Sequence, residues 1–164
     1  MRTLARRSKF HRAMGNVRVR EVRAEYVSLP SPLMSVTGPE ALARIFFEFF
    51  QTFRDPQENV LAAYLDSRGG LLGVERVYRG TLNFASAATR DVLRNALVMS
   101  AVSVLIGHNH PSGDPNPSAD DILFTRRLID AGRLLNIDVV DHLVLGTTPE
   151  GVLRFTSIKQ RGVI

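Results

Sequence analysis

The sequence predicts an α/β fold in which helices flank a mixed β-sheet. Two neighbouring apolar stretches, 58–65 and 71–78, are joined by the turn-like residues 66–70, which is typical of a β-hairpin. Helical segments then alternate with two further apolar strands at 102–107 and 138–145. A hairpin combined with alternating helices and strands favours a layered α/β domain rather than an all-helical or all-β one.

Three segments have apolar residues at helical spacing. The first opens at residues 37–40, with Pro39 near its first turn. Its apolar face is an aromatic-rich stripe, interpreted as core or as a dimer face: Ala41, Leu42, Ile45, Phe46, Phe49 and Phe50. The second helix is predicted over 89–99 and the third from about 118 to 135. A last short strand is expected at 152–157, after a turn at 149–151.

The beginning of the chain has a different composition. Residues 1–20 contain no acidic side chain and a group of basic ones: Arg2, Arg6, Arg7, Lys9, Arg12, Arg18 and Arg20. We predict a basic N-terminal arm with a short strand over 1–30, followed by one domain over 31–164. Such an arm either solubilises the protein or makes non-specific contact with DNA.

Composition limits the possible functions. A chain of 164 residues is long enough for one domain with a proper core. It contains no cysteine, which excludes disulfides, a thiol nucleophile and thiolate metal ligands, so any metal must be bound by nitrogen and oxygen. No stretch approaches the ~20 apolar residues of a membrane span, and the arginine-rich start lacks the apolar core of a signal peptide. We therefore expect a cytoplasmic protein without membrane contact.

A possible metal-binding motif follows the strand at 102–107. Side chains two residues apart on an extended chain point the same way, so His108 and His110 can face one point. Ser118 is a good helix N-cap, and Asp121 stands three residues later, as in a capping box. If the proline-rich loop 111–117 folds back, both imidazoles and the Asp121 carboxylate surround a divalent cation. Three protein ligands and one open position for water are typical of catalytic zinc. A helix cap beside two loop histidines is the simpler alternative.

The spacing His-x-His, seven residues, Ser-x-x-Asp resembles that of the JAMM (MPN-plus) metalloprotease family. The wider text His-Asn-His-Pro-Ser-Gly-Asp-Pro is similar to its RadC branch, and the similarity extends over about 39–155, through segments at 65–66, 80–83, 90–97 and 141–146. The resemblance implies a three-layer JAB/MPN-like fold, related to cytidine deaminases, with helices on both sides of a curved sheet. Full-length RadC-like proteins carry an additional N-terminal helical region, so we expect a short stand-alone form here.

The resemblance also implies a general base. JAMM proteins place a glutamate at the beginning of the strand that leads into the hairpin, and Glu58 stands at this position. From the residues alone, Glu75 and Glu48 are alternatives. Glu58 is expected to take a proton from the catalytic water and return it to the leaving amine, while Ser118 donates a hydrogen bond to the oxyanion.

The predicted function is therefore zinc-dependent hydrolysis of an amide or isopeptide bond in a peptide or protein, with Zn²⁺ held by His108, His110 and Asp121. The alternative is a DNA-associated protein, a DNA-repair factor or metal-dependent nuclease, which the basic arm and the DNA-repair label of RadC proteins suggest. A single His₂Asp site favours the hydrolase, since many nucleases use paired metals. A scaffold without activity is disfavoured because every ligand position is filled.

Two further residues have open interpretations. Asp114 either supports a ligand imidazole or serves only as a turn residue beside Pro115. His142 is either a core histidine bonded to backbone or part of the cleft, and it is not counted as a ligand. The sequence does not determine the oligomeric state, and a homodimer through the aromatic helix is possible.

Overall fold

The structure is a computed structural model that describes residues 38–53, 57–80 and 87–162. Its elements are, in order, α1 (Pro39–Phe53), β1 (Asn59–Leu65), β2 (Leu71–Arg79), α2 (Ala87–Val98), β3 (Ser103–Asn109), α3 (Ala119–Leu134), β4 (Asp138–Thr147) and β5 (Leu153–Ser157). The strands form one sheet in the order β2-β1-β3-β4-β5. Only the β3–β4 pair is parallel, so the described sheet is mixed, as predicted. The predicted basic arm and its strand lie outside the described residues.

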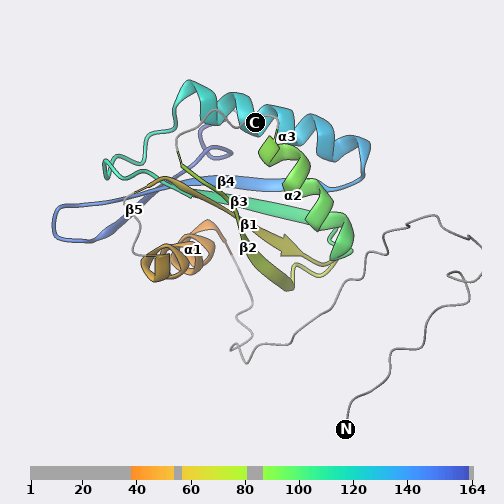
Figure 1. Ribbon diagram of the computed structural model, residues 1–164, viewed down its shortest axis with the longest axis horizontal. Coiled ribbons are helices and arrows are strands. Elements are labelled where there is room, and N and C mark those ends of the chain that lie inside the picture. The colour runs from red at the N-terminus through yellow and green to blue at the C-terminus, as the bar shows by residue number, and fades with distance from the viewer. Residues whose placement is uncertain (1–37, 54–56, 81–86, 163–164) are drawn as a thin grey trace, which may run out of the picture.

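Helices cover both faces of the sheet, which gives three layers (Figure 1). Alternate side chains of a strand point to opposite faces, and the core is divided accordingly. Val60, Ala62 and Tyr64 of β1 pack in one buried cluster with Phe124 and Leu128 of α3. The residues between them pack with α1 on the other face, together with Leu105, Leu143 and Leu145. The α/β fold with helices on both sides of a mixed sheet is thus confirmed.

The aromatic-rich face of α1 is core in part. Leu42, Ala43 and Phe46 are buried against the sheet. The ring of Phe46 lies directly over Gly107 of β3, where a Cβ atom would come within 2.3 Å of its Cδ2. Phe49 of the same face is 39 % exposed. A homodimer through this helix stays a prediction.

The central strand β3 is longer than predicted. The strand is predicted to end at Gly107, because the apolar run ends there and His108 and Asn109 are polar. In the structure His108 is part of the strand, because it pairs with Val60 of β1 on one side and Val144 of β4 on the other. Two neighbouring strands provide the backbone partners that keep this polar end extended. The first metal-ligand candidate therefore lies on a rigid element.

None of the helices within the described ranges is long and apolar enough to span a bilayer.

The substitution Gly107→Ala tests the packing of α1 on the sheet. The added Cβ would overlap the buried ring of Phe46, so we expect the free energy of unfolding to fall by roughly 1–3 kcal/mol, the usual cost of overpacking. Chemical denaturation measures this change. Gly73→Ala is the matched control, since its Cβ would lie 3.4 Å from the Met99 sulfur. Equal losses in both variants would contradict the proposed contact.

Candidate metal centre

Four side chains that could hold a metal meet at one end of the sheet. Glu58 lies just before β1, His108 lies near the end of β3, His110 follows that strand, and Asp121 lies in the first turn of α3. One ligand atom from each of them lies within 4.8 Å of the other three. The structure therefore brings together the three predicted metal ligands and the predicted base.

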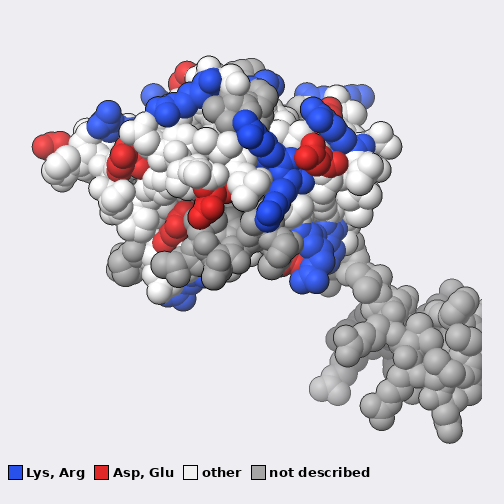
Figure 2. All heavy atoms as spheres, turned by 90° about the horizontal axis from the view of Figure 1, so that it is seen from above, with Lys and Arg blue, Asp and Glu red and all other residues white. Residues whose placement is uncertain are grey.

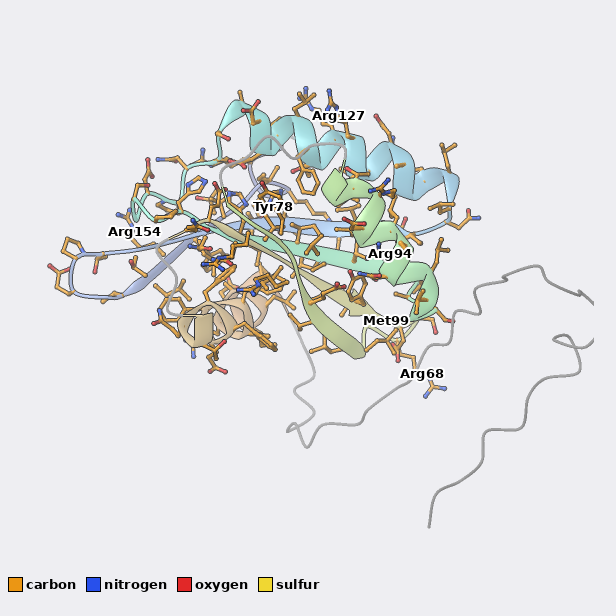
Figure 3. The ribbon with its side chains drawn as sticks, viewed as in Figure 1. Arg68, Tyr78, Arg94, Met99, Arg127 and Arg154 are labelled. Atoms are coloured by element: carbon orange, nitrogen blue, oxygen red, sulfur yellow. The ribbon has the colours of Figure 1, made fainter. Side chains whose placement is uncertain are left out.

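The loop that follows His110 is fixed against β4. The His110 N–H donates to the Leu145 carbonyl oxygen at 2.8 Å. Gly113 has φ +82°, and a Cβ there would lie 2.5 Å from the Thr147 carbonyl oxygen. A Cβ on Gly146 would in turn lie 2.1 Å from the Gly113 carbonyl oxygen. Two glycines thus allow the backbones of loop and strand to approach closely, which positions His110 beside His108. In Figure 3, Arg154 of β5 and Tyr78 of β2 lie toward the end of the sheet that carries the metal group, and Arg68 and Met99 lie toward the opposite end.

The two imidazoles face each other across a short gap. The Nε2 atoms of His108 and His110 are 2.9 Å apart. Two nitrogen ligands of a tetrahedral zinc ion, each about 2.0–2.1 Å from the metal, are separated by about 3.3 Å. The Asp121 carboxylate lies beside both rings, with Oδ1 3.3 Å from His108 Nε2 and Oδ2 3.5 Å from His110 Nε2. Slight movements of these side chains would accommodate one cation.

Two carboxylate oxygens of this group have no hydrogen-bond partner among the described residues. They are Glu58 Oε1 and Asp121 Oδ1, and both are buried. Glu58 Oε1 lies 3.7 Å from His108 Nε2. Buried acceptors without a partner are rare in native structures and require an explanation. A cation between the two imidazoles and the Asp121 carboxylate provides one for Asp121 Oδ1, since nitrogen and oxygen are suitable ligands for zinc. The residues present therefore fit a divalent metal.

Ser118 caps α3 and holds the Asp121 carboxylate. The predicted capping box is present: the Asp121 N–H donates to Ser118 Oγ at 3.2 Å, and the Ser118 N–H donates to Asp121 Oδ2 at 2.7 Å. The Ser118 hydroxyl also donates to Oδ2, at 2.7 Å. Oδ2 is thus engaged by the cap, whereas Oδ1 faces His108. One carboxylate serves both as helix cap and as candidate ligand, so the two interpretations do not exclude each other.

Of the three glutamates that the sequence offers as a base, Glu58 belongs to the metal group. Glu75 instead accepts hydrogen bonds from Tyr64 and Asn95 on β2's inner face, and Glu48 is exposed on α1. The amide of Asn109, between the two histidines, holds the chain around Glu58. It accepts from the Asn59 N–H at 2.8 Å and donates to the Gln57 carbonyl oxygen at 3.2 Å. Sequence reasoning missed this contact, because it depends on how β1 and β3 are paired.

The environment changes the acidity of the group. Burial, and then the negative charge of Asp121, raise the pKa of Glu58 to about 7. Burial opposes ionisation of Asp121, yet its close contacts with the His108 and His110 imidazoles hold its pKa well below the usual range. A hydrogen bond to Asp121 raises the pKa of His110, whereas burial lowers that of His108. A carboxyl group that titrates near neutrality is suited to accept and release protons.

The two residues with open interpretations both contact the ligand histidines. The Asp114 carbonyl oxygen lies 2.7 Å from His110 Nδ1, while its carboxylate accepts from Asn116 in a turn. Asp114 is therefore both a turn residue and a support, through its backbone. His142 is buried, and burial holds its pKa well below the usual value. Its ring contacts the side chains of His108 and Thr125, and not backbone as one interpretation expected.

The pH dependence of stability tests the environment of Glu58 in protein freed of metal by a chelator. Between its ordinary pKa of 4.5 and about 7, the folded protein keeps a proton at Glu58 that the unfolded chain has released. This contribution therefore lowers the free energy of unfolding as the pH rises through that window. Glu58→Gln removes this contribution. The free energy of unfolding of the variant minus that of wild type should therefore rise with pH, by at most about 3 kcal/mol between those pH values. Denaturant titrations at several pH values measure it, and a constant difference would contradict the raised pKa.

Comparisons with known proteins show the family of this chain. Residues 36–163 match the family model described as RadC-like JAB domain. The chain is 43 % identical over 108 residues to a UPF0758 protein of Moorella thermoacetica, covering 66 % of this chain and 45 % of that protein. It is 33 % identical over 153 residues to a UPF0758 protein of Syntrophomonas wolfei, covering 93 % and 58 %. A UPF0758 protein of Methanosarcina mazei is 41 % identical over 133 residues, covering 81 % and 55 %.

The chain thus spans about half the length of the curated relatives it matches. The family match covers all the described elements, including the four residues of the metal group. By this match, the chain belongs to the RadC-like JAB domain family.

Proposed function

We propose that this protein is a zinc-dependent hydrolase that cleaves an amide or isopeptide bond in a peptide or protein. One observation carries the proposal: two imidazoles and two carboxylates converge within 4.8 Å, and two of the carboxylate oxygens are buried without a hydrogen-bond partner in the part of the chain that the structure describes. A group of acceptors gathered around one point suits a cation, and the family match places the chain among JAB domains.

His108, His110 and Asp121 are the residues proposed to hold the metal. They provide two nitrogens and one oxygen, the type of ligand set found in catalytic zinc sites that keep one position open. Zinc bound there would act as a Lewis acid and would make water more acidic. The absence of cysteine leaves nitrogen and oxygen as the available donors, which agrees with this set.

Glu58 is proposed to move the proton. It lies at the rim of the group, with Oε1 3.7 Å from His108 Nε2, and in the metal-free protein burial raises its pKa to about 7. It would take a proton from the attacking water and release it to the nitrogen of the leaving amine. Its backbone is tied on both sides by the Asn109 amide, which limits how far the carboxylate can move.

Ser118 is proposed to stabilise the oxyanion that forms at the substrate carbonyl. Its hydroxyl has one hydrogen, which points to Asp121 Oδ2 at 2.7 Å. Rotation about the Cβ–Oγ bond can redirect this hydrogen to a substrate oxygen, while the Ser118 N–H continues to hold Oδ2. The helix cap would therefore persist while the hydroxyl serves the reaction.

The DNA-associated alternative has less support. Among the described residues, one group of four side chains could hold a metal ion, whereas many nucleases use two metals. On the face covered by α2 and α3, basic side chains are interrupted by acidic and uncharged ones (Figure 2). The basic arm lies outside the described residues, and its contact with DNA stays a prediction, as does the cytoplasmic location.

Glu58→Gln tests the proposed reaction. Zinc-loaded wild type and variant are compared on a panel of peptides and isopeptide-linked substrates, with product formation followed by mass spectrometry. We expect the rate to fall by about 10²–10⁴-fold, the usual contribution of a general base, while zinc content stays unchanged. Glu75→Gln, which alters a glutamate outside the metal group, is the control and should retain activity.

Hydrolysis that persists in Glu58→Gln would show that Glu58 is not the base. Hydrolysis by wild type that survives removal of zinc with a chelator would contradict a metal-dependent reaction. If the zinc-loaded wild type cleaves no member of the panel, the amide-bond assignment is wrong for these substrates, and the same panel extended to DNA tests the alternative.

A further inference from the structure

We infer that His142 and Thr125 form a hydrogen-bond chain that fixes the tautomer of His108 and thereby leaves its Nε2 free to bind the metal. This inference rests on the proposed metal site, but neither residue belongs to the ligand group. It assigns to His142 a positioning role, carried out through His108.

Three contacts connect one candidate ligand with another. His108 Nδ1 lies 2.7 Å from His142 Nε2, and His142 Nδ1 lies 2.6 Å from Thr125 Oγ1. The Thr125 hydroxyl in turn donates to the backbone carbonyl oxygen of Asp121 at 2.6 Å. His108 and Thr125 are fully buried, and His142 is 1 % exposed, so water does not compete for these bonds. The chain therefore begins at the His108 ring and ends at the backbone of Asp121.

The direction of each hydrogen bond follows from the last link. A carbonyl oxygen can only accept, so the single hydroxyl hydrogen of Thr125 is given to Asp121. Thr125 Oγ1 must then accept from His142 Nδ1, which places the hydrogen of a neutral His142 ring on Nδ1. His142 Nε2 is left with a lone pair and accepts from His108 Nδ1.

This order determines which nitrogen of His108 faces the metal group. With its hydrogen on Nδ1, the neutral His108 ring presents a lone pair at Nε2, the atom 2.9 Å from His110 Nε2 and 3.3 Å from Asp121 Oδ1. The opposite order would put a hydrogen on Nε2, where a metal would have to bind. His110 reaches the same state by another route, because its Nδ1 faces the Asp114 carbonyl oxygen.

Three elements of the fold, β3, β4 and α3, hold the hydrogen-bond chain in place. His108 and His142 lie on the adjacent parallel strands β3 and β4, and their ring centroids are 4.8 Å apart. Thr125 lies on α3 one turn after Asp121. The ring of Phe124 meets His142 edge-on, with centroids 5.8 Å apart. A change at His142 would therefore be transmitted to the metal ligand without altering the ligand set itself.

Zinc affinity and histidine tautomers together test the inference. Affinity is measured by competition with a chromophoric chelator in the full-length protein, using Zn²⁺ alone as the probe. His142→Leu removes the acceptor for His108 Nδ1, and we expect zinc affinity to fall about 10- to 100-fold, the usual effect of losing such a partner. His142→Gln offers an amide oxygen as acceptor and should restore most of that loss.

Thr125→Val is the matched variant that leaves both histidines in place. Valine has nearly the same shape as threonine but cannot accept from His142 Nδ1, so the hydrogen order is no longer fixed. We expect a smaller loss of zinc affinity than in His142→Leu. Denaturation of the metal-free proteins reports folding, and if His142→Leu does not fold, Thr125→Val carries the test.

Nitrogen NMR of the imidazoles distinguishes positioning from mere stability, and the chain has only four histidines to assign. In the folded metal-free wild type, His108 should carry its hydrogen on Nδ1, and Thr125→Val should show a mixture of tautomers. An Nε2 hydrogen on His108 in the wild type would overturn the inference. Wild-type affinity in a folded His142→Leu or Thr125→Val variant, or no difference between His142→Gln and His142→Leu, would also overturn it.

The metal-free spectra keep this test separate from the proposed function. If wild type binds no zinc, the proposed function fails, and the tautomer of His108 still supports or overturns the hydrogen-bond chain. If wild type binds zinc and the variants bind it equally well, the chain has no positioning role while the proposed function stands.

Discussion

The carboxylate of Asp121 takes part in two arrangements at once, and the rest of the site depends on how its oxygens are divided. Oδ2 accepts from the backbone N–H and the hydroxyl of Ser118, which closes the first turn of α3. Oδ1 is left buried beside His108 Nε2, and no described residue gives it a hydrogen bond. The start of a helix thereby fixes a carboxylate at the point where two imidazoles meet. Even the chain through Thr125 ends on the backbone of this same residue.

The sheet provides the other half of the arrangement. β3 is its central strand, with β1 antiparallel on one side and β4 parallel on the other. Its polar end holds His108 between Val60 and Val144, while Gly107 admits Phe46 on the opposite face. β3 therefore presents the candidate ligand His108 on the face covered by α3, and Gly107, which contacts Phe46 of α1, on the opposite face. Poor packing of Phe46 on Gly107 would therefore disturb the residue that directly precedes the candidate ligand His108.

The sequence predicted best what lies close together along the chain. His108, His110, Ser118 and Asp121 belong to one strand, loop and helix start, so their spacing alone indicates a shared site. Glu58 required the family resemblance, because it reaches the group only through the pairing of β1 with β3. The fold class and the order of elements could be predicted from apolar periodicity. The end of β3 could not, because its last two residues, His108 and Asn109, are polar.

Contacts between distant residues could not be predicted from a single sequence. The pairing of His142 with His108 depends on the register of β4 against β3, and the Asn109 amide reaches Gln57 and Asn59 only after the sheet has formed. Apolar spacing indicates strands but does not determine their register. A different limit applied to Asp114, because its support of His110 comes from a backbone carbonyl oxygen, which every residue type has.

Metal content per chain tests the central claim most directly. Wild type and Asp121→Ala are purified without chelator and dialysed first against buffer with zinc and then against zinc-free buffer. Elemental analysis then compares their zinc contents under equal conditions. The arrangement of His108, His110 and Asp121 predicts about one zinc ion per wild-type chain and a large loss in the variant. No retained zinc in the wild type, or equal zinc in the variant, would contradict a metal centre built on Asp121.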